Sequence, residues 1–170
     1  MSSVVIRAAE QADLAVLTEI YNHYVVHTSI TFDLMPFTVE ARQPWFDAHA
    51  TDPRHRLFVA VESGQLVGYA STSRFREKAA YQTTVEATIY CRPAAVGHGI
   101  GRALYERLFA SIVGEDIHRI VAGVTMPNAA SVALHERFGF QRVGTFSANG
   151  RKFGQYWDVA WFERPRTLTS

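Results

Sequence analysis

The sequence has a single cysteine, Cys91, and no cluster of cysteine and histidine at the spacing of a zinc site. One cysteine cannot form an internal disulfide, and a chain of 170 residues can bury roughly 70% of its unfolded surface without a cross-link or a structural metal. No apolar run approaches the roughly 20 residues of a membrane-spanning helix, and no apolar signal sequence follows a charged stretch at the N-terminus. We therefore expect a cytoplasmic protein without a metal site or a membrane span.

An excess of charge of one sign is also missing. The chain has 17 Lys+Arg and 16 Asp+Glu, which gives a formal net charge of +1. Binding to a phosphate backbone requires a strongly basic surface, so nucleic acid is not an expected partner. No repeat, low-complexity tract or linker interrupts the chain. We predict a single domain over residues 1–163 and a short polar C-terminal tail at 164–170.

Short segments with strand and helix patterns alternate along the chain. Strands are predicted at 4–8, 57–61, 66–71, 85–91, 117–124, 141–146 and 156–162. Helices are predicted at 14–24, from Thr38 through Phe46, after residues 97–101 with a stop near Gly114, and from Pro127 to Gly139. The turn at residues 62–65 contains Gly64 and favours an antiparallel hairpin. The order indicates a mixed α/β fold, with antiparallel pairing first and strand-helix-strand crossovers later.

A glycine-rich segment, Gly97-His98-Gly99-Ile100-Gly101-Arg102, lies between a predicted strand and a predicted helix. The free N–H groups and the dipole of a helix start favour a phosphate or pyrophosphate, and glycine lets it approach the backbone. A flexible turn is the alternative, because short glycine motifs often arise without function. A dinucleotide-binding motif is disfavoured, since Arg102 stands in place of its third glycine.

A second motif places polar residues on one face of a predicted helix. Asn128, Ser131 and His135 have the spacing i, i+3 and i+7, so together they would line a groove. Taken singly, Asn128 would be a plain N-cap and His135 a solvated surface residue.

Taken in order, these motifs resemble the GCN5-related N-acetyltransferase (GNAT) superfamily. Residues 21–26, 31–32, 84–86, 135–136 and 150–159 resemble the phosphinothricin and methionine sulfoximine/sulfone acetyltransferases. The resemblance implies an α/β fold with a mixed, mostly antiparallel central sheet flanked by helices, and a splayed strand pair that binds acetyl-CoA. The superfamily loop usually begins with Gln or Arg, and Val96 stands there instead, so one side-chain contact to the cofactor is expected to be lost.

The resemblance also implies where acetyl-CoA binds. Its pyrophosphate would lie on residues 97–102, and Asn128 and Ser131 would lie toward the pantetheine and phosphate. The expected cofactor-binding residues are Ile89, Tyr90, Cys91, Gly97, His98, Gly99, Ile100, Gly101, Arg102, Asn128 and Ser131.

Acetyl transfer to an amine needs a neutral nucleophile, a donor at the thioester carbonyl, and protonation of the leaving thiolate. Glu86 is the candidate base, because burying an unpaired carboxylate is costly and a pocket explains its place in a strand better than a core does. The alternative is an ion pair with Arg74, Arg76 or Lys78. His135 stands where many superfamily members carry a Tyr thought to protonate the thiolate. It is therefore the second candidate catalytic residue.

Two further roles are expected for residues 89–91, at the end of the predicted strand 85–91. Backbone N–H groups of residues 89–91 would polarise the thioester carbonyl. Cys91 is expected to pack rather than to act as a nucleophile, since the resemblance implies direct transfer and no histidine is paired with it by spacing.

The acceptor is expected to be a small molecule with both an anionic group and an amine. Arg74 and Arg76 lie just beyond a predicted strand and precede Tyr81, and an Arg fork can pair a carboxylate or phosphinate bidentately. Phe32 would complete the substrate-binding set. The alternatives are a solvated charge run for the cations and core packing for Phe32 and Tyr81.

The sequence thus predicts an acetyl-CoA-dependent N-acetyltransferase of the phosphinothricin or methionine sulfoximine/sulfone type. Its relatives suggest a homodimer, with Trp157 and Trp161 in packing roles. A peptide or protein N-acetyltransferase and a non-catalytic CoA-binding sensor remain as alternatives.

Overall fold

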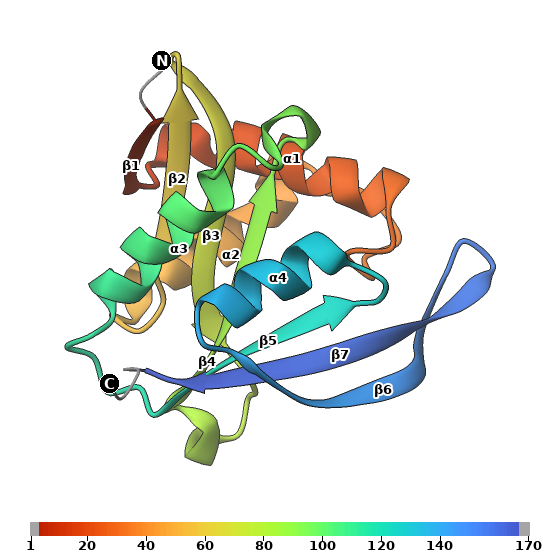
Figure 1. Cartoon of the computed structure of the whole chain (residues 1–170). Coiled ribbons are helices and arrows are strands. Elements are labelled where there is room, and N and C mark those ends of the chain that lie inside the picture. Colours follow the sequence, from red (N-terminus) through yellow and green to blue (C-terminus); the bar gives the residue numbers. More distant parts are fainter. Residues whose placement is uncertain (1–3, 167–170) are drawn as a thin grey trace.

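The structure is a computed structural model that describes residues 4–166, and its centre is a seven-stranded sheet with helices on both faces (Figure 1). The strands are β1 (Val4–Ala8), β2 (Leu57–Glu62), β3 (Gln65–Arg74), β4 (Thr84–Cys91), β5 (Arg119–Thr125), β6 (Gln141–Lys152) and β7 (Gln155–Pro165). Their order is β1-β2-β3-β4-β5-β7-β6, with β4 and β5 parallel and the other neighbours antiparallel. The predicted mixed, mostly antiparallel sheet is confirmed.

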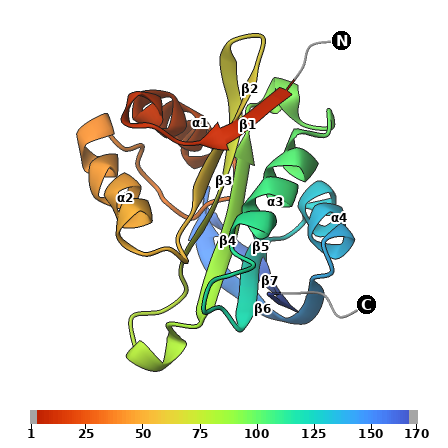
Figure 2. The same ribbon diagram turned by 90° about the vertical axis from the view of Figure 1, so that its left-hand side faces the viewer.

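Four α-helices of the described chain cover the sheet: α1 (Leu14–His27), α2 (Val39–Thr51), α3 (Ile100–Ser111) and α4 (Ala129–Arg137). Figure 2 shows α1 and α2 on one face and α3 and α4 on the other. The Thr38 hydroxyl accepts the Ala41 N–H at 3.2 Å, and the Asn128 side chain accepts the Ser131 N–H at 3.1 Å, so both residues are N-caps. None of the helices within residues 4–166 is long and apolar enough to cross a membrane.

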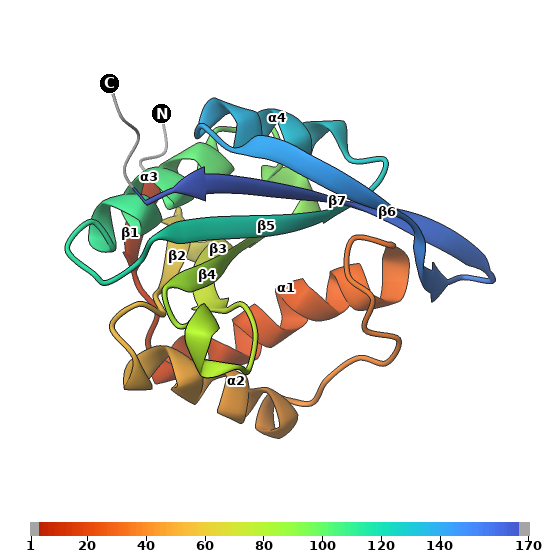
Figure 3. The ribbon, with the colours of Figure 1, turned by 90° about the horizontal axis from the view of Figure 1, so that it is seen from below.

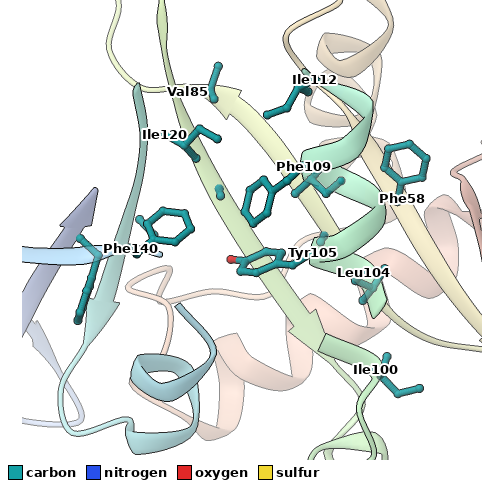
Figure 4. Packing of buried hydrophobic residues seen from close by; sticks show 14 of the residues in the cluster. Phe58, Val85, Ile100, Leu104, Tyr105, Phe109, Ile112, Ile120 and Phe140 are labelled. Carbon is teal, nitrogen blue, oxygen red and sulfur yellow. The ribbon is translucent and has the colours of Figure 1, made fainter. Parts of the chain in front are cut away.

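Alternation along the central strands produces one apolar core on each face. On one face, Leu104 and Leu108 of α3 belong to one cluster with Val85 and Ile120, and Figure 4 shows Leu104, Val85 and Ile120 of this cluster. On the other face, residues of α1 pack with β2 and β3 in a second cluster of Leu17, Ile20, Tyr24, Leu57, Val59, Leu66 and Tyr69.

The parallel pair at the centre of the sheet separates after three residues. Residues 84–86 of β4 pair with residues 119–121 of β5, and beyond Glu86 the two strands diverge (Figure 1). Alternate backbone groups of residues 87–91 therefore face an opening instead of a neighbouring strand. This opening positions the site described below.

The C-terminal boundary differs from the prediction. Strand β7 continues to Pro165, two residues into the segment predicted as a tail from residue 164. Arg164 is buried, and its guanidinium donates to the Phe138 carbonyl at 2.8 Å, which ties this part of the strand to the end of α4. Residues 167–170 of the predicted tail lie outside the described residues.

Strands β6 and β5 also have bounds different from those expected. Strand β6 runs to Lys152 rather than to 146, because a register shift between Phe146 and Gly150 lets pairing with β7 resume. Strand β5 begins at Arg119 rather than at 117, although Ile117 is still buried in the core.

Candidate active site

A cleft of about 690 Å³ lies between the start of α3 and α4, and we call it the α3–α4 cleft. It brings together the glycine-rich segment and the polar face of α4 that the sequence singled out. Nine of the eleven expected cofactor-binding residues line it: Ile89, Tyr90, Cys91, Gly97, Gly99, Gly101, Arg102, Asn128 and Ser131.

The glycine-rich segment forms an open backbone cradle at one end of this cleft. Gly97 and Gly99 have φ of +89° and +83°, a left-handed conformation that disfavours other residues, and a Cβ on either would meet nothing within 4 Å. No described residue accepts a hydrogen bond from the backbone N–H groups of Gly97, Gly99 or residues 100–102. Free N–H groups at a helix start fit an anionic group such as a pyrophosphate.

Three positions of this segment act differently from what was expected. The Ile100 side chain is buried in the core and His98 points into solvent, so only their backbone can serve the cleft. A Cβ on Gly101 would lie 3.2 Å from Leu134 Cδ2 and 3.4 Å from Ile89 Cδ1. Gly101 is therefore needed for the close packing of α3 against β4 and α4 as well as for access to the cleft.

Where β4 and β5 diverge, a cavity of about 50 Å³ passes through the sheet, and we call it the splay cavity. Ala87, Val124 and Asn128 border it on the α3–α4 side, and Thr88 and Tyr90 border it on the α1–α2 side. A group that enters along the α3–α4 cleft can thus reach the opposite face of the sheet.

His135 lies at the wall of the splay cavity and is only 3% exposed, so it is not a solvated surface residue. Its Nδ1 lies 2.7 Å from the Ser131 carbonyl oxygen, and its Nε2 lies 3.0 Å from the Tyr105 hydroxyl. A carbonyl can only accept, so Nδ1 carries the hydrogen and Nε2 accepts from Tyr105. Burial lowers the pKa of His135, which keeps the ring neutral.

This arrangement does not support the expected role of His135 as the acid that protonates a thiolate. The one hydrogen on its neutral ring is already donated to Ser131, and Nε2 has none to give. The ring instead fixes the Tyr105 hydroxyl, which points from α3 toward the side of β5 (Figure 4).

Glu86 lies on the α1–α2 face of β4, next to Val121 on β5 and Ser73 on β3. It is half-buried, and within residues 4–166 its carboxylate makes neither a hydrogen bond nor an ion pair. Burial raises the pKa of Glu86, and the charge of Arg76 partly opposes this rise. An unpaired carboxyl with a raised pKa is the state expected of a general base.

A groove of about 560 Å³ runs along β5, β7 and β6 on the same face of the sheet, and we call it the Trp161 groove; Glu86 itself is not among the residues that line it. Thr84 and Val121, the neighbours of Glu86 on β4 and β5, form its inner end. Its walls are mainly aromatic and apolar, with two guanidinium groups and one carboxylate: Phe75, Arg76, Tyr81, Arg119, Val143, Phe146, Trp161 and Glu163. Thr88, two residues along β4 on the same face, borders the splay cavity. Glu86 therefore stands between the cavity and the groove.

Of the four expected substrate-binding residues, Arg76 and Tyr81 line the Trp161 groove, and Arg74 and Phe32 do not. The guanidinium of Arg76 lies over the rings of Phe75 and Tyr81, at 4.9 and 5.9 Å from their centroids, and both Arg76 and Tyr81 line the Trp161 groove. Arg74 instead forms an exposed ion pair with Glu77 at 2.8 Å, which matches the alternative of a solvated charge run.

Phe32 lies among the residues of neither the groove nor the other cavities described above. Its ring packs against the backbone at Gly150 in the β6–β7 hairpin.

Cys91 borders the α3–α4 cleft, but its thiol is not activated. Burial raises the pKa of the Cys91 thiol to about 11, so it carries no thiolate at neutral pH. The Cys91 carbonyl accepts a hydrogen bond of 2.5 Å from the Tyr24 hydroxyl. This agrees with a packing role for the side chain.

Sequence reasoning missed several residues of the α3–α4 cleft. Ala130, Ala133, Leu134 and Arg137 form one face of α4, and their spacing of i, i+3, i+4 and i+7 was a signal that could have found them. Tyr24 and Ile30 come from α1 and from the connection after it, and no local pattern marks them.

Comparisons with known proteins agree with this geometry. Residues 6–161 match the family described as an acetyltransferase (GNAT) domain. The chain is 52% identical over 166 residues to a phosphinothricin N-acetyltransferase of Streptomyces coelicolor, covering 96% of this chain and 97% of that one. It is 35% identical over 158 residues to an L-methionine sulfoximine/L-methionine sulfone acetyltransferase of Salmonella typhimurium, covering 93% and 92%. A solved acetyltransferase from Salmonella typhimurium with its cofactor acetyl-CoA has a TM-score of 0.92 at 34% identity, covering 98% and 96%.

Proposed function

The chain belongs to the GNAT acetyltransferase family, and we propose that it transfers the acetyl group of acetyl-CoA directly to the amine of a small amino-acid-like acceptor. Phosphinothricin, methionine sulfoximine and methionine sulfone are the first candidates. The observation that carries the proposal is the position of Glu86 between the splay cavity and the Trp161 groove.

The α3–α4 cleft fits acetyl-CoA, whose thioester supplies the activated acetyl group. The unpaired N–H groups of Gly97 and of residues 99–102 suit its pyrophosphate, and the open space at Gly97 and Gly99 admits close approach. From there the cleft runs along α4 to Asn128 and Ser131, which also border the splay cavity. The acetyl group would therefore arrive at the opening in the sheet.

The Trp161 groove fits an amino-acid-like acceptor. Arg76 can pair an anionic group, and Tyr81 and Trp161 offer an apolar surface for a side chain. An acceptor held in this groove would have its amine at the inner end, beside Glu86.

In this arrangement Glu86 takes the proton of the amine, directly or through a water molecule, as the amine attacks the thioester carbonyl. Alternate backbone N–H groups of residues 89–91 face the opening and can stabilise charge on the carbonyl oxygen. The CoA thiolate is a tolerable leaving group near neutral pH, so no dedicated protein acid is needed. His135 and Tyr105 then serve to shape the cavity.

The expectation of a homodimer also becomes a proposal. Strand β6 is a 12-residue edge strand with an exposed outer side, and Val143 and Phe146 on it are 58% and 56% exposed. A long exposed edge with apolar side chains favours pairing with another chain. We propose that β6 belongs to the dimer face, and Phe146→Lys should give a monomer in sedimentation velocity.

The test of the function is a free-thiol release assay with acetyl-CoA and a panel of acceptors. The panel contains phosphinothricin, methionine sulfone, free and amidated amino acids, polyamines and peptides, with the acetylated product identified by mass spectrometry. Turnover with the first two and little with amidated amino acids is expected. Turnover on peptides alone would establish the peptide alternative, and CoA binding without any turnover would establish a sensor.

A further inference from the structure

The end of the β6–β7 hairpin lies against the connection between α1 and α2, residues 28–38 (Figure 3). Lys152, the last residue of β6, is only 4% exposed, and its Nζ donates to the Thr31 carbonyl at 2.7 Å. No described carboxylate lies within ion-pair distance of it. Burial lowers the pKa of Lys152, and the charge of Asp33 partly opposes this, so the hydrogen bond to the Thr31 carbonyl is the direct polar contact that fixes the buried ammonium.

A second contact joins the same two segments independently. The Phe32 ring occupies the space that a side chain at residue 150 would need, so that a Cβ on Gly150 would overlap the ring. Glycine at this position lets the aromatic ring lie directly on the hairpin backbone. The hairpin thus holds Thr31 by a hydrogen bond and Phe32 by packing.

The residue next to this double contact is part of the site. Ile30 borders both the α3–α4 cleft and the splay cavity, and its backbone N–H is held by the Thr28 hydroxyl at 3.2 Å. A shift of Thr31 and Phe32 away from the hairpin would carry Ile30 out of the cavity wall.

We infer that Lys152, Gly150, Thr31 and Phe32 form a clasp that holds Ile30 over the splay cavity, which makes Lys152 a positioning residue for acetyl transfer. This loop clasp rests on the proposed function, because the cavity matters as the place where the acetyl group is transferred. It also gives Phe32 a function different from the expected wall of the acceptor pocket.

The clasp has a kinetic consequence. Ile30 lines the cavity but not the Trp161 groove, so loosening the clasp should disturb the thioester position and leave acceptor binding intact. It should also admit water to the thioester. Attack by water on the carbonyl carbon breaks the C–S bond and gives acetate and the free CoA thiol without any acceptor.

The test compares Lys152→Met with the native enzyme. We expect kcat for acetyl transfer to fall about tenfold, with the acceptor KM and the acetyl-CoA Kd changed less than about threefold. Thiol release without acceptor, relative to release with saturating acceptor, should rise about tenfold. Partial unfolding would lower both rates together, and the binding stoichiometry in calorimetry reports the folded fraction.

Two further variants complete the comparison. Arg151→Met removes the neighbouring cation, which is exposed and lies over Tyr156, and should behave like the native enzyme. Lys152→Arg keeps a charged donor and should recover most of the coupling between thiol release and acetylation. Native-like kcat and coupling in Lys152→Met would overturn the inference, as would equal losses in Arg151→Met.

Two readouts remain usable if a variant folds poorly or if the proposed function fails. Gly150→Ala disturbs the clasp through Phe32 alone. Like Lys152→Met, it should raise thiol release without acceptor relative to release with saturating acceptor. Hydrogen exchange of residues 28–34 should become faster in both variants, and unchanged exchange would overturn the clasp whatever the enzyme acetylates. An enzyme that acetylates no acceptor but shows this faster exchange would refute the proposed function and keep the clasp.

Discussion

The guanidinium of Arg76 lowers the pKa of the Glu86 carboxyl against the burial that raises it. Arg76 lines the Trp161 groove, and Glu86 lies on the neighbouring face of β4, so in the proposed function the pair would couple recognition of the acceptor to the protonation state of the base. Removing the cation should therefore change both binding and pH dependence.

Arg76→Ala should raise the acceptor KM by an amount equivalent to about 1.5–3 kcal/mol, the value of a charge-assisted hydrogen bond. The base acts as carboxylate, so kcat/KM falls as the pH drops through the pKa of Glu86. Without Arg76 that pKa rises further, and the acidic limb of the profile should move to higher pH. Arg74→Ala is the matched control, because Arg74 pairs with Glu77 at the surface. If the acidic limb of the pH profile does not move in Arg76→Ala, Arg76 does not influence the protonation of Glu86.

Glu86→Gln should lower turnover by about 10²- to 10⁴-fold, with little change in acetyl-CoA affinity, because the amide keeps the shape and cannot accept the proton. The same variant should be more stable than the native protein at pH 7.5, since burial disfavours the ionised carboxyl. This difference should shrink on acidification, as Glu86 becomes protonated in the folded protein. Thermal unfolding at several pH values measures it. Native-like turnover would make Glu86 structural.

Gly99→Val should weaken acetyl-CoA binding in calorimetry, because a side chain there projects from the backbone that receives the pyrophosphate. Gly64→Val is the control, since Gly64 also has a positive φ, of +78°, and open space around it in the distant β2–β3 turn. Both variants carry similar backbone strain of about 1–2 kcal/mol, so only the first should lose affinity. Equal affinities in two folded variants would remove the glycine-rich segment from the donor site.

Tyr105→Phe should destabilise the protein by about 1–3 kcal/mol, because His135 Nε2 would lose its donor inside the core. His135→Ala should destabilise it further through the cavity it leaves, and the two changes should be non-additive. Chemical denaturation of the single and double variants measures this coupling. Both single variants should retain far more turnover than Glu86→Gln. A loss in His135→Ala as large as that in Glu86→Gln would restore the histidine to an acid role.

The sequence predicts the residues of the α3–α4 cleft better than those of the Trp161 groove. Glycines at 97 and 99 and the cap at Asn128 are defined by local backbone requirements, and their spacing carries that information. The direction of Arg74 depends on the turn after β3, which pairs it with Glu77, and alternation along an extended segment could not reveal this. The place of Ile30 depends on Lys152, whose contact with Thr31 spans 121 residues of the chain.

The hydrogen bonds of His135 could not be read from the sequence for a related reason. The spacing with Asn128 and Ser131 located the residue correctly on the inner face of α4. The roles of its two ring nitrogens depend on Tyr105 from another helix, which no pattern within α4 contains.

The splay cavity shares wall residues with the α3–α4 cleft, and the Trp161 groove begins four residues away along β4, on the α1–α2 face of the sheet. In the proposed function, acetyl-CoA and the acceptor would therefore enter from different sides, so they could bind in either order, and CoA and the acetylated product could leave separately. The described walls of the α3–α4 cleft and of the Trp161 groove share no residue, so in the proposed function mutations in the groove would alter acceptor choice while acetyl-CoA binding stays intact. Such a division lets closely related chains diverge in the amines they modify without rebuilding the rest of the enzyme.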